Sequence, residues 1–274
     1  MKKKIVNFIK KILPQKLFFE LLIIYQAIKL RCLKYIFYKT KYDLEYNESN
    51  FEKLGFEIKK IKIILQNTNL DYFNPKLSWH YHIFAGLQSL EREKKGGGID
   101  NILEIGTHDG NFTNFLSKIF KLSKITTIDL KKNSKGFINS YNRNNNNYLK
   151  KFLEKRNYNL KNSNIVFKEM NSFDLLEHYN RSCFDLIFLD GDHTNPQVSM
   201  DVLSAFFLLK RGGILVCDDI YINKKDNRFN EKSDGYEPVK YLDSINKTKS
   251  IYFVKRVFRH NSYTKKYISY SLKI

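Results

Sequence analysis

The amino-acid sequence predicts an α/β fold with a doubly wound, mostly parallel sheet, and three observations support this prediction. Short apolar runs bounded by turn residues recur along the chain, as expected of strands that are buried on both faces. Segments with helical spacing separate these runs, which is typical of βαβ units. Several runs end in an acidic residue, and right-handed crossovers bring such strand ends to one edge of the sheet. A ligand crevice is therefore expected at that edge.

Composition indicates a folded protein without a polyanionic partner. The 274 residues are 42% hydrophobic and 15% aromatic, which is too apolar for a disordered chain. Half of the net charge of +20 lies in residues 1–41, where eleven Lys or Arg side chains face only Glu20. The remaining charge is scattered, so a general bias towards Lys, Asn and Ile explains it better than nucleic-acid binding does. Three cysteines without C-x-x-C spacing indicate neither disulfides nor zinc and fit a reducing, cytoplasmic location.

Residues 1–75 are predicted to form a basic helical appendage and connector, followed by the main domain at 76–274. An amphipathic helix over 5–12 ends at Pro14, and the apolar run over 17–28 contains Glu20 and is too short to span a bilayer. The segment is also a poor signal peptide, because no small-residue cleavage site follows. The helices either lie on an anionic membrane surface or pack on the main domain or a second subunit, and we favour packing. A connector helix is expected near 56–66.

The helical pattern after Trp79 contains His80 and His82, which either line a pocket or belong to a buried helix. A strand over 101–105, a loop from Gly106 to Gly110 and a helix over 111–120 then form a cradle for a nucleoside-containing cofactor. The spacing is E-x-G-x-x-x-G, in which Glu104 would repel a pyrophosphate and suit a cationic ligand.

Two further strands supply candidate cofactor contacts. The strand over 124–129 ends in Asp129, nineteen residues after Gly110, where its carboxylate can accept both hydroxyls of a ribose. The strand over 165–169 is followed by Asn171, which either bonds an adenine edge or caps a helix. The Asn-rich segment 142–147 is expected to be a solvated loop or helix lead-in.

The third candidate group of residues lies in the segment 184–221. Its strands over 184–189 and 214–217 end in Asp190 and in Asp218 with Asp219, and the intervening helix over 198–210 is expected to stop at the Gly212-Gly213 pair. Three converging carboxylates repel each other unless a cation neutralises them, and oxygen ligands suit Mg²⁺ or Ca²⁺. Neither strand-end motif contains a Lys or Arg placed to do this. His193 can reach the same space, whereas Asp192 fits a turn or helix cap, a role that any single one of these acids can also have.

The C-terminal part is expected to complete the fold. Residues 222–235 are polar and long enough for a lid, and a helix follows over 238–245. The runs 250–258 and 263–272 are expected to pair as an antiparallel hairpin at the sheet edge.

Taken together, LEIGTHDGNFT, the acid at Asp129, FDLIFLDGDH and LLKRGGILVCDD resemble class I S-adenosylmethionine-dependent methyltransferases. Within that superfamily, residues 78–274 are most similar to the metal-dependent O-methyltransferases of the macrocin and mycinamicin sugar type. The resemblance implies a Rossmann-like fold. It also implies a cofactor site for S-adenosylmethionine, formed by Glu104, Gly106, Thr107, Gly110, Asp129 and Asn171. Asn171 stands where the family usually has Asp, and Thr107-His108-Asp109 replace smaller loop residues, which leaves the role of His108 open.

The resemblance further implies Mg²⁺ held by Asp190, Asp218 and Asp219, and a catalytic base at His193. The implied reaction moves a methyl group to a hydroxyl of a small-molecule or saccharide acceptor. A nucleic-acid methyltransferase is the first alternative, although LDGDH stands where base-methylating enzymes carry an (Asp/Asn)-Pro-Pro-aromatic motif. The second is a non-catalytic scaffold that residues 1–41 attach to the inner membrane surface. Whether the protein forms a homo-oligomer is left open.

Overall fold

The computed structural model describes residues 13–40, 42–74, 77–91, 98–141, 143–222, 235–259 and 262–274. The expected helix over 5–12 and nearly all of the expected lid at 222–235 therefore lie outside the described residues. Seven strands form one sheet in the order β3-β2-β1-β4-β5-β7-β6. Their bounds are β1 Asn101–Ile105, β2 Lys124–Asp129, β3 Ile165–Glu169, β4 Phe184–Leu189, β5 Leu209–Ile220, β6 Thr248–Arg259 and β7 Ser262–Lys273.

The first five strands are parallel, and the C-terminal hairpin joins them antiparallel through the pairing of β7 with β5. This arrangement confirms the predicted Rossmann-like fold, including the hairpin at the sheet edge. The strand order reverses at β1, which lies between β2 and β4. Ligands of open α/β sheets bind beyond the carboxyl ends of the strands at such a reversal. The loops after β1, β2 and β4 therefore frame the expected crevice.

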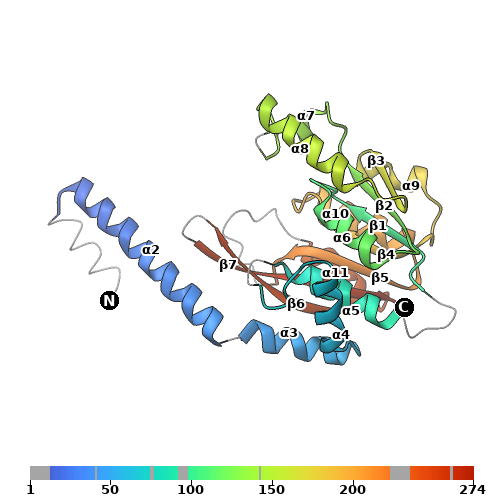
Figure 1. Cartoon of the computed structure of the whole chain (residues 1–274), viewed down its shortest axis with the longest axis horizontal. Coiled ribbons are helices and arrows are strands. Elements are labelled where there is room, and N and C mark those ends of the chain that lie inside the picture. The colour runs from blue at the N-terminus through green and yellow to red at the C-terminus, as the bar shows by residue number, and fades with distance from the viewer. Residues whose placement is uncertain are drawn as a thin grey trace.

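Helices cover both faces of the sheet (Figure 1). One face packs against side chains of α4 (Ile58–Asn67), α5 (Trp79–Glu91) and α6 (Asn111–Ile119). The other face packs against α9 (Leu175–His178), α10 (Gln197–Leu208) and α11 (Tyr236–Ser244). The remaining helices are α2 (Gln15–Thr40), α3 (Tyr42–Lys53), α7 (Lys135–Asn139), α8 (Asn146–Asn159) and the short 3-10 helix η1 (Ser172–Asp174). Two layers of helices thus enclose the parallel strands, as their continuous apolar runs require.

Helices α3 and α4, which the sequence analysis assigned to the appendage and connector, share the core of the sheet. Phe51 and Ile61 are fully buried there, and the ring of Phe51 lies 4.9 Å from that of Phe253 on β6. Asn47 donates to the carbonyl of Val254 and accepts from its N–H at 3.0 and 2.8 Å. The side chain of Asn47 therefore pairs with the edge strand as another strand would.

Strand β5 begins earlier than expected, and the preceding helix ends earlier. Helix α10 stops at Leu208, because Leu209 already pairs with Phe184 of β4. The register then shifts before Leu186 pairs with Ile214, and Gly212 in this irregular segment has a φ of +75°. The two glycines therefore lie in a bulge within the strand. The prediction that these glycines end the helix was therefore wrong.

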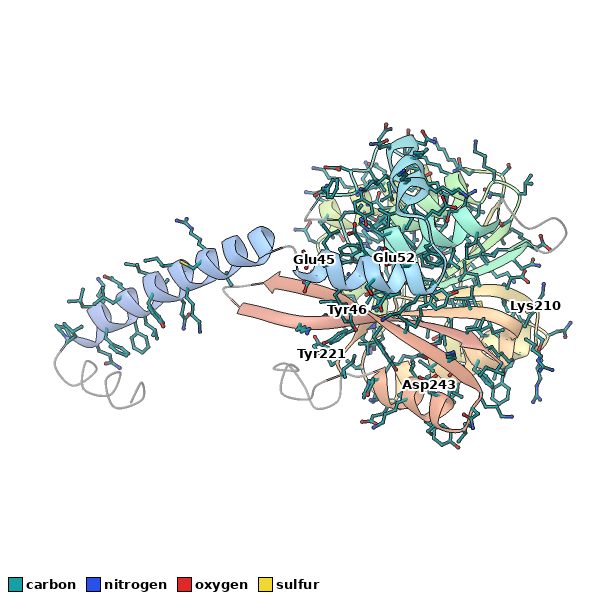
Figure 2. The ribbon with its side chains drawn as sticks, turned by 90° about the horizontal axis from the view of Figure 1, so that it is seen from below. Glu45, Tyr46, Glu52, Lys210, Tyr221 and Asp243 are labelled. Carbon is teal, nitrogen blue, oxygen red and sulfur yellow. The ribbon has the colours of Figure 1, made fainter. Side chains whose placement is uncertain are left out.

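Helix α2 extends away from the body of the molecule (Figures 1 and 2). It does not pack on the sheet. From the sequence, packing on the main domain or on a second subunit was favoured. The described part of α2 does not show the first of these. Apolar side chains on α2 are instead exposed, including Leu17, Leu21, Ile24 and Ile28. Among the described helices, none combines the length and apolarity needed to cross a bilayer.

Candidate active site

The loop between β1 and α6 lies directly against the end of β4. Gly106 has a φ of +106°, and a Cβ atom there would lie 2.3 Å from the carbonyl oxygen of Asp190. Gly110, with a φ of +73°, caps the start of α6. Both positions lie in the left-handed region that favours glycine. The predicted cofactor loop and the first predicted acid are therefore neighbours in space.

Glu104 lies at the bottom of this loop and is almost fully buried. The hydroxyls of Thr113 and Thr127 both donate to its Oε2 atom at 2.5 Å. Burial raises the pKa of Glu104 to about 8, although these two hydrogen bonds oppose the shift. A buried carboxyl group of this kind gains from a nearby positive charge, which agrees with the predicted preference for a cationic ligand.

Asp129 is the last residue of β2, and backbone N–H groups bond both of its carboxylate oxygens. The N–H groups of His108 and Leu130 donate to its Oδ2 and Oδ1 atoms at 3.1 and 2.8 Å. Burial raises its pKa, while these bonds and the charges of Arg143 and Arg156 act in the opposite direction. The carboxylate is thus fixed beside the glycine loop, at the edge where the sequence predicts the ribose site.

Two other loop residues have structural contacts. The hydroxyl of Thr107 lies 2.6 Å from that of Thr127 in the interior. His108 has a φ of +48°, and its ring packs edge-on against Tyr141 and Phe152. The His108 ring therefore supports the loop from its outer side.

Asn171 and Asp192 both accept hydrogen bonds from residues two positions further along the chain. The Oδ1 atom of Asn171 accepts from the N–H of Phe173 at 3.0 Å and caps η1, as the helix-cap reading expects. An adenine contact of Asn171 stays a prediction. Asp192 accepts from both the N–H and the hydroxyl of Thr194, which is the turn expected for it.

Asp190 and His193 form a pair at the end of β4. The Nε2 atom of His193 lies 3.3 Å from Oδ1 of Asp190. Burial and the carboxylate of Asp218 raise the pKa of Asp190. Burial alone would lower the pKa of His193, but the bond to Asp190 and the charges of Asp219 and Asp218 raise it above the ordinary value. The imidazole therefore holds a proton more readily than a free histidine does.

Asp218 and Asp219 lie in a bulge of β5, where the register towards β7 shifts between Cys217 and Ile220. Asp219 has a φ of +56°, which is uncommon for a residue other than glycine. The ammonium of Lys255 on β6 bonds Oδ2 of Asp218 and lies 2.9 Å from Oδ1 of Asp219. Lys266 on β7 bonds Oδ2 of the same Asp219. The hairpin therefore brings two cations onto two of the three predicted metal ligands.

The strand-end motifs do not reveal these lysines, because both belong to the C-terminal hairpin. The uncompensated negative charge from which Mg²⁺ was inferred is in fact compensated by lysines from 37 and 47 residues away. Among the described residues, no three His, Cys, Asp or Glu side chains are grouped to hold a metal ion. The residues as arranged do not fit a divalent cation, since two of the three acids already bond ammonium groups.

The two histidines of α5 are buried, as one of the two expectations for this helix required. His80 lies with its Nδ1 atom 4.0 Å from Oδ2 of Asp218, and its ring packs against Phe112 and Phe188. Burial lowers its pKa to about 3, so the ring is neutral at pH 7. His82 bonds the carbonyl of Tyr72 at 2.9 Å and belongs to the core.

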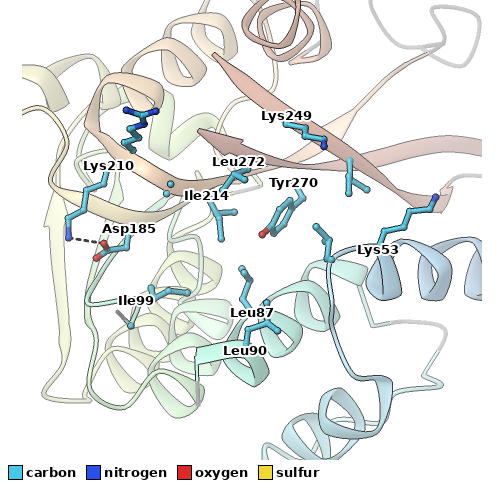
Figure 3. Close-up of a pocket in the computed structure, with 16 residues that line it drawn as sticks. Lys53, Leu87, Leu90, Ile99, Asp185, Lys210, Ile214, Lys249, Tyr270 and Leu272 are labelled. Atoms are coloured by element: carbon cyan, nitrogen blue, oxygen red, sulfur yellow. Dashed lines mark hydrogen bonds and ion pairs between the residues drawn. The ribbon is translucent and has the colours of Figure 1, made fainter. Parts of the chain in front are cut away.

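A cavity of about 510 Å³ opens at the other edge of the sheet (Figure 3). It is lined by Leu87 of α5, Asp185 at the start of β4, and Lys249 and Tyr270 of the hairpin. Asp185 bonds Lys210 there at 2.7 Å. None of the predicted site residues contributes to this cavity, because they lie towards the carboxyl ends of the strands.

The strand order, the glycine loop and the fixed acid at the end of β2 are typical of α/β domains that bind nucleoside-containing cofactors. Residues 103–220 match the model of a family described as a methyltransferase domain. The segment from β1 to β5 is thus similar to a methyltransferase domain. A search of curated proteins gave no match.

Solved structures with a similar arrangement include the O-methyltransferase TomG from Streptomyces achromogenes in complex with S-adenosylmethionine. It is 15% identical, with 82% of this chain and 94% of that chain covered and a TM-score of 0.48. A putative O-methyltransferase from Klebsiella pneumoniae is 13% identical, with coverages of 84% and 96% and a TM-score of 0.47. An O-methyltransferase from Bacillus cereus is 18% identical, with coverages of 79% and 92% and a TM-score of 0.44. At these values the similarity says nothing about the acceptor.

Proposed function

We propose that the protein transfers the methyl group of S-adenosylmethionine to a hydroxyl oxygen of a small-molecule or saccharide acceptor. The observation that supports this most is the contact between Gly106 and the backbone of Asp190. Through it, the cofactor loop lies beside the Asp190–His193 pair, whose nitrogen and oxygen are 3.3 Å apart. A methyl donor in the loop and a proton acceptor after β4 would then share one crevice.

The cofactor would be held by the residues around the glycine loop. Gly106 and Gly110 let the backbone approach the ligand closely, and Asp129 would accept the ribose hydroxyls. Glu104 supplies a carboxyl group below the loop, where a positively charged sulfonium compound stabilises its ionised form. Thr107 would position the loop through Thr127, and Asn171 would lie towards the adenine.

In this proposal His193 is the general base. Its Nε2 atom faces Asp190, so the neutral ring donates that proton to the carboxylate and leaves Nδ1 free to accept one. The acceptor oxygen attacks the methyl carbon, the carbon–sulfur bond breaks, and its electron pair stays on sulfur. The hydroxyl proton moves to Nδ1 of His193. A base of this kind contributes on the order of 10² to 10⁴ in rate.

No metal step is included, because Lys255 and Lys266 already bond the acids that were expected to hold Mg²⁺. A magnesium requirement and membership of the macrocin and mycinamicin type stay predictions from the sequence. Chelation decides the first of these directly.

The test of the proposed function is incubation of the full chain with labelled S-adenosylmethionine and a panel of glycans, glycolipids and catechols. Each reaction is run with EDTA and, separately, with Mg²⁺. We expect label in a hydroxyl-containing acceptor and S-adenosylhomocysteine in equal amount. Transfer of label to RNA or DNA alone would favour the nucleic-acid alternative, and binding of S-adenosylmethionine without any transfer would favour the scaffold.

We also propose that α2 attaches the protein to an anionic membrane surface. Leu17, Leu21, Ile24 and Ile28 are spaced by three or four residues, so they form one stripe along the helix, and each is 43–55% exposed. Residues 1–41 carry a net charge of +10, which complements anionic lipid headgroups. A second copy of the chain would not be favoured by a surface of the same charge.

Sedimentation with vesicles tests this second proposal. The full chain should sediment with phosphatidylglycerol vesicles and much less with phosphatidylcholine vesicles. Leu21→Glu with Ile24→Glu should abolish binding, whereas Ile63→Glu, on an equally exposed residue of α4, should leave it unchanged. If the stripe instead mediates self-association, the wild type is a dimer by sedimentation without lipid, and the Leu21 and Ile24 variant is a monomer.

A further inference from the structure

We propose that Lys255 and Lys266 take the place of a divalent cation in this site, and that the ammonium of Lys255 is a catalytic group that donates a hydrogen bond to the acceptor oxygen. The inference rests on the proposed transfer to a hydroxyl. It assigns the electrostatic part of that reaction to two side chains of the C-terminal hairpin.

The register of the hairpin gives the first argument. Lys255 of β6 and Lys266 of β7 are direct cross-strand partners. Two like charges placed directly opposite each other in an antiparallel pair are destabilising. Here both ammonium groups are bonded to carboxylates within β5, namely those of Asp218 and Asp219. The cross-strand lysine pair is therefore favourable only because the two carboxylates offset the repulsion between the ammonium groups.

The balance of charge gives the second argument. The three carboxylates at this edge belong to Asp190, Asp218 and Asp219. The two ammonium groups compensate two of them, and the third pairs with His193. The site is neutral when His193 is protonated and carries one negative charge when the imidazole is free to act as a base. A bound Mg²⁺ would leave an excess of positive charge unless it displaced the lysines.

The surroundings of Lys255 give the third argument. Its side chain is 17% exposed, and that of Asp218 is 2% exposed, so the ion pair lies in an environment where screening by water is weak. Burial alone would lower the pKa of Lys255, but the carboxylates of Asp218, Asp219 and Asp190 raise it. The ammonium is therefore charged at neutral pH. Among the described residues its bonds to the two acids use two of its three N–H donors, and the third is left for an oxygen.

The position of the pair agrees with this role. Lys255 bonds Asp218 and Asp219, and the charges of both acids act on His193. In the reaction, negative charge grows on the acceptor oxygen as its proton moves to His193. The Lys255 ammonium stabilises that charge without giving up a proton, and Lys266 acts as a positioning residue that holds Asp219. Removing one such donor typically lowers kcat by about 10² to 10³.

The first experiment needs no acceptor. Mg²⁺ and, separately, Mn²⁺ are titrated into the full-length wild type and into the Lys255→Met, Lys266→Met double variant by calorimetry. We expect no one-to-one metal binding at millimolar concentrations by the wild type, and a new metal site in the double variant, where the acids are uncompensated. One-to-one Mg²⁺ binding by the wild type that Asp218→Asn abolishes would overturn the inference.

The second experiment uses the acceptor found with labelled S-adenosylmethionine. Wild-type turnover should persist in EDTA. Lys255→Met should lower kcat about 10²-fold with little change in the KM of the acceptor, and Lys255→Arg should retain part of the activity. Lys249→Met is the matched control, since Lys249 lies on the same strand but lines the cavity at the other edge. Unchanged affinity for S-adenosylmethionine shows that each variant is folded.

Two results would contradict the catalytic role of Lys255. One is loss of wild-type turnover in EDTA with recovery in Mg²⁺, and the other is full activity of Lys255→Met. Failure to methylate any acceptor would count against the proposed function and leave the calorimetric result to decide the metal question alone.

Discussion

Gly106 and Asp190 are in backbone contact, because a Cβ atom on Gly106 would lie 2.3 Å from the Asp190 carbonyl oxygen. Asp190 in turn donates its N–H to the carbonyl of Ile105 at 2.9 Å. The cofactor loop and the end of β4 are therefore in direct backbone contact, and a change at Gly106 is expected to affect both cofactor binding and the position of Asp190.

Gly106→Ala should lower the free energy of unfolding by more than about 2 kcal/mol, because it combines a positive φ with a backbone clash. Gly212→Ala is the matched control. Gly212 also has a positive φ, but no atom lies within 4 Å of its Cβ position, so only the conformational cost of about 1–2 kcal/mol applies. Denaturant unfolding measures both variants. Equal losses in the two variants would mean that the Gly106 contact is not tight.

Glu104→Gln should change the pH dependence of stability. The folded-state pKa of Glu104 is about 8, well above its ordinary 4.5, so between these values the folded chain holds a proton that the unfolded chain has lost. This contribution is fully present below pH 4.5 and is lost as the pH rises to 8, by up to about 1.4 kcal/mol per pH unit. The wild type should therefore lose stability over this interval relative to the variant. Parallel curves in denaturant unfolding would contradict the shift, and Glu177→Gln, at an exposed position of α9, serves as the control.

Asp129→Ala should weaken the binding of S-adenosylmethionine by tenfold or more, because a ribose loses its paired acceptor. Calorimetry measures the affinity directly. Asp100→Ala, an exposed acid at the opposite edge of the sheet, should bind as the wild type does. Unaltered binding by Asp129→Ala would remove the ribose role.

His193→Ala should reduce turnover by about 10² or more and leave cofactor affinity nearly unchanged, since the lost interaction belongs to the transition state. The neutral imidazole is the base, and the pKa of His193 is raised, so wild-type activity should increase with pH through a pKa above 6.5. The variant should lack this limb. His178→Ala, at an exposed position of α9, should retain it. A limb that persists without His193 would mean that His193 only holds Asp190 in place.

Asn47→Ala should destabilise the protein by about 1–3 kcal/mol or more, because it leaves the buried N–H and carbonyl of Val254 without partners. Thermal or denaturant unfolding measures the loss. Asn139→Ala on the surface of α7 should have little effect. An equal effect of the two substitutions would show that the helix is not anchored through this amide.

The parallel strands were predictable because each is a short apolar run that ends at a turn or an acid. The expected bounds of β1, β2, β3 and β4 agree with the structure. The start of β5 was not predictable in this way. Leu209 continues the apolar pattern of α10, and only its pairing with Phe184 shows that the strand has begun.

The lysines of the site could not be found from motifs, since their place depends on the register of the hairpin. A signal was present in the alternation of the two strands. Phe253 and Ile268 are fully buried on the face that packs against α4, α5 and α6, and Lys255 and Lys266 stand two residues from them on the same face. A lysine that continues a buried face needs an acidic partner, and two such lysines in register need two.

The pairing of Asn47 with Val254 has a consequence for the molecule as a whole. Strand β6 is the last strand of the sheet, and its outer backbone groups would otherwise be open to a strand of another molecule. Asn47 occupies both groups of Val254, and Asn50 donates to the carbonyl of Tyr252 at 3.1 Å. The side-chain amides of α3 thus bond backbone groups two residues apart on β6, as the backbone of a neighbouring strand would. At these residues a helix blocks the β6 edge of the sheet against pairing with another molecule.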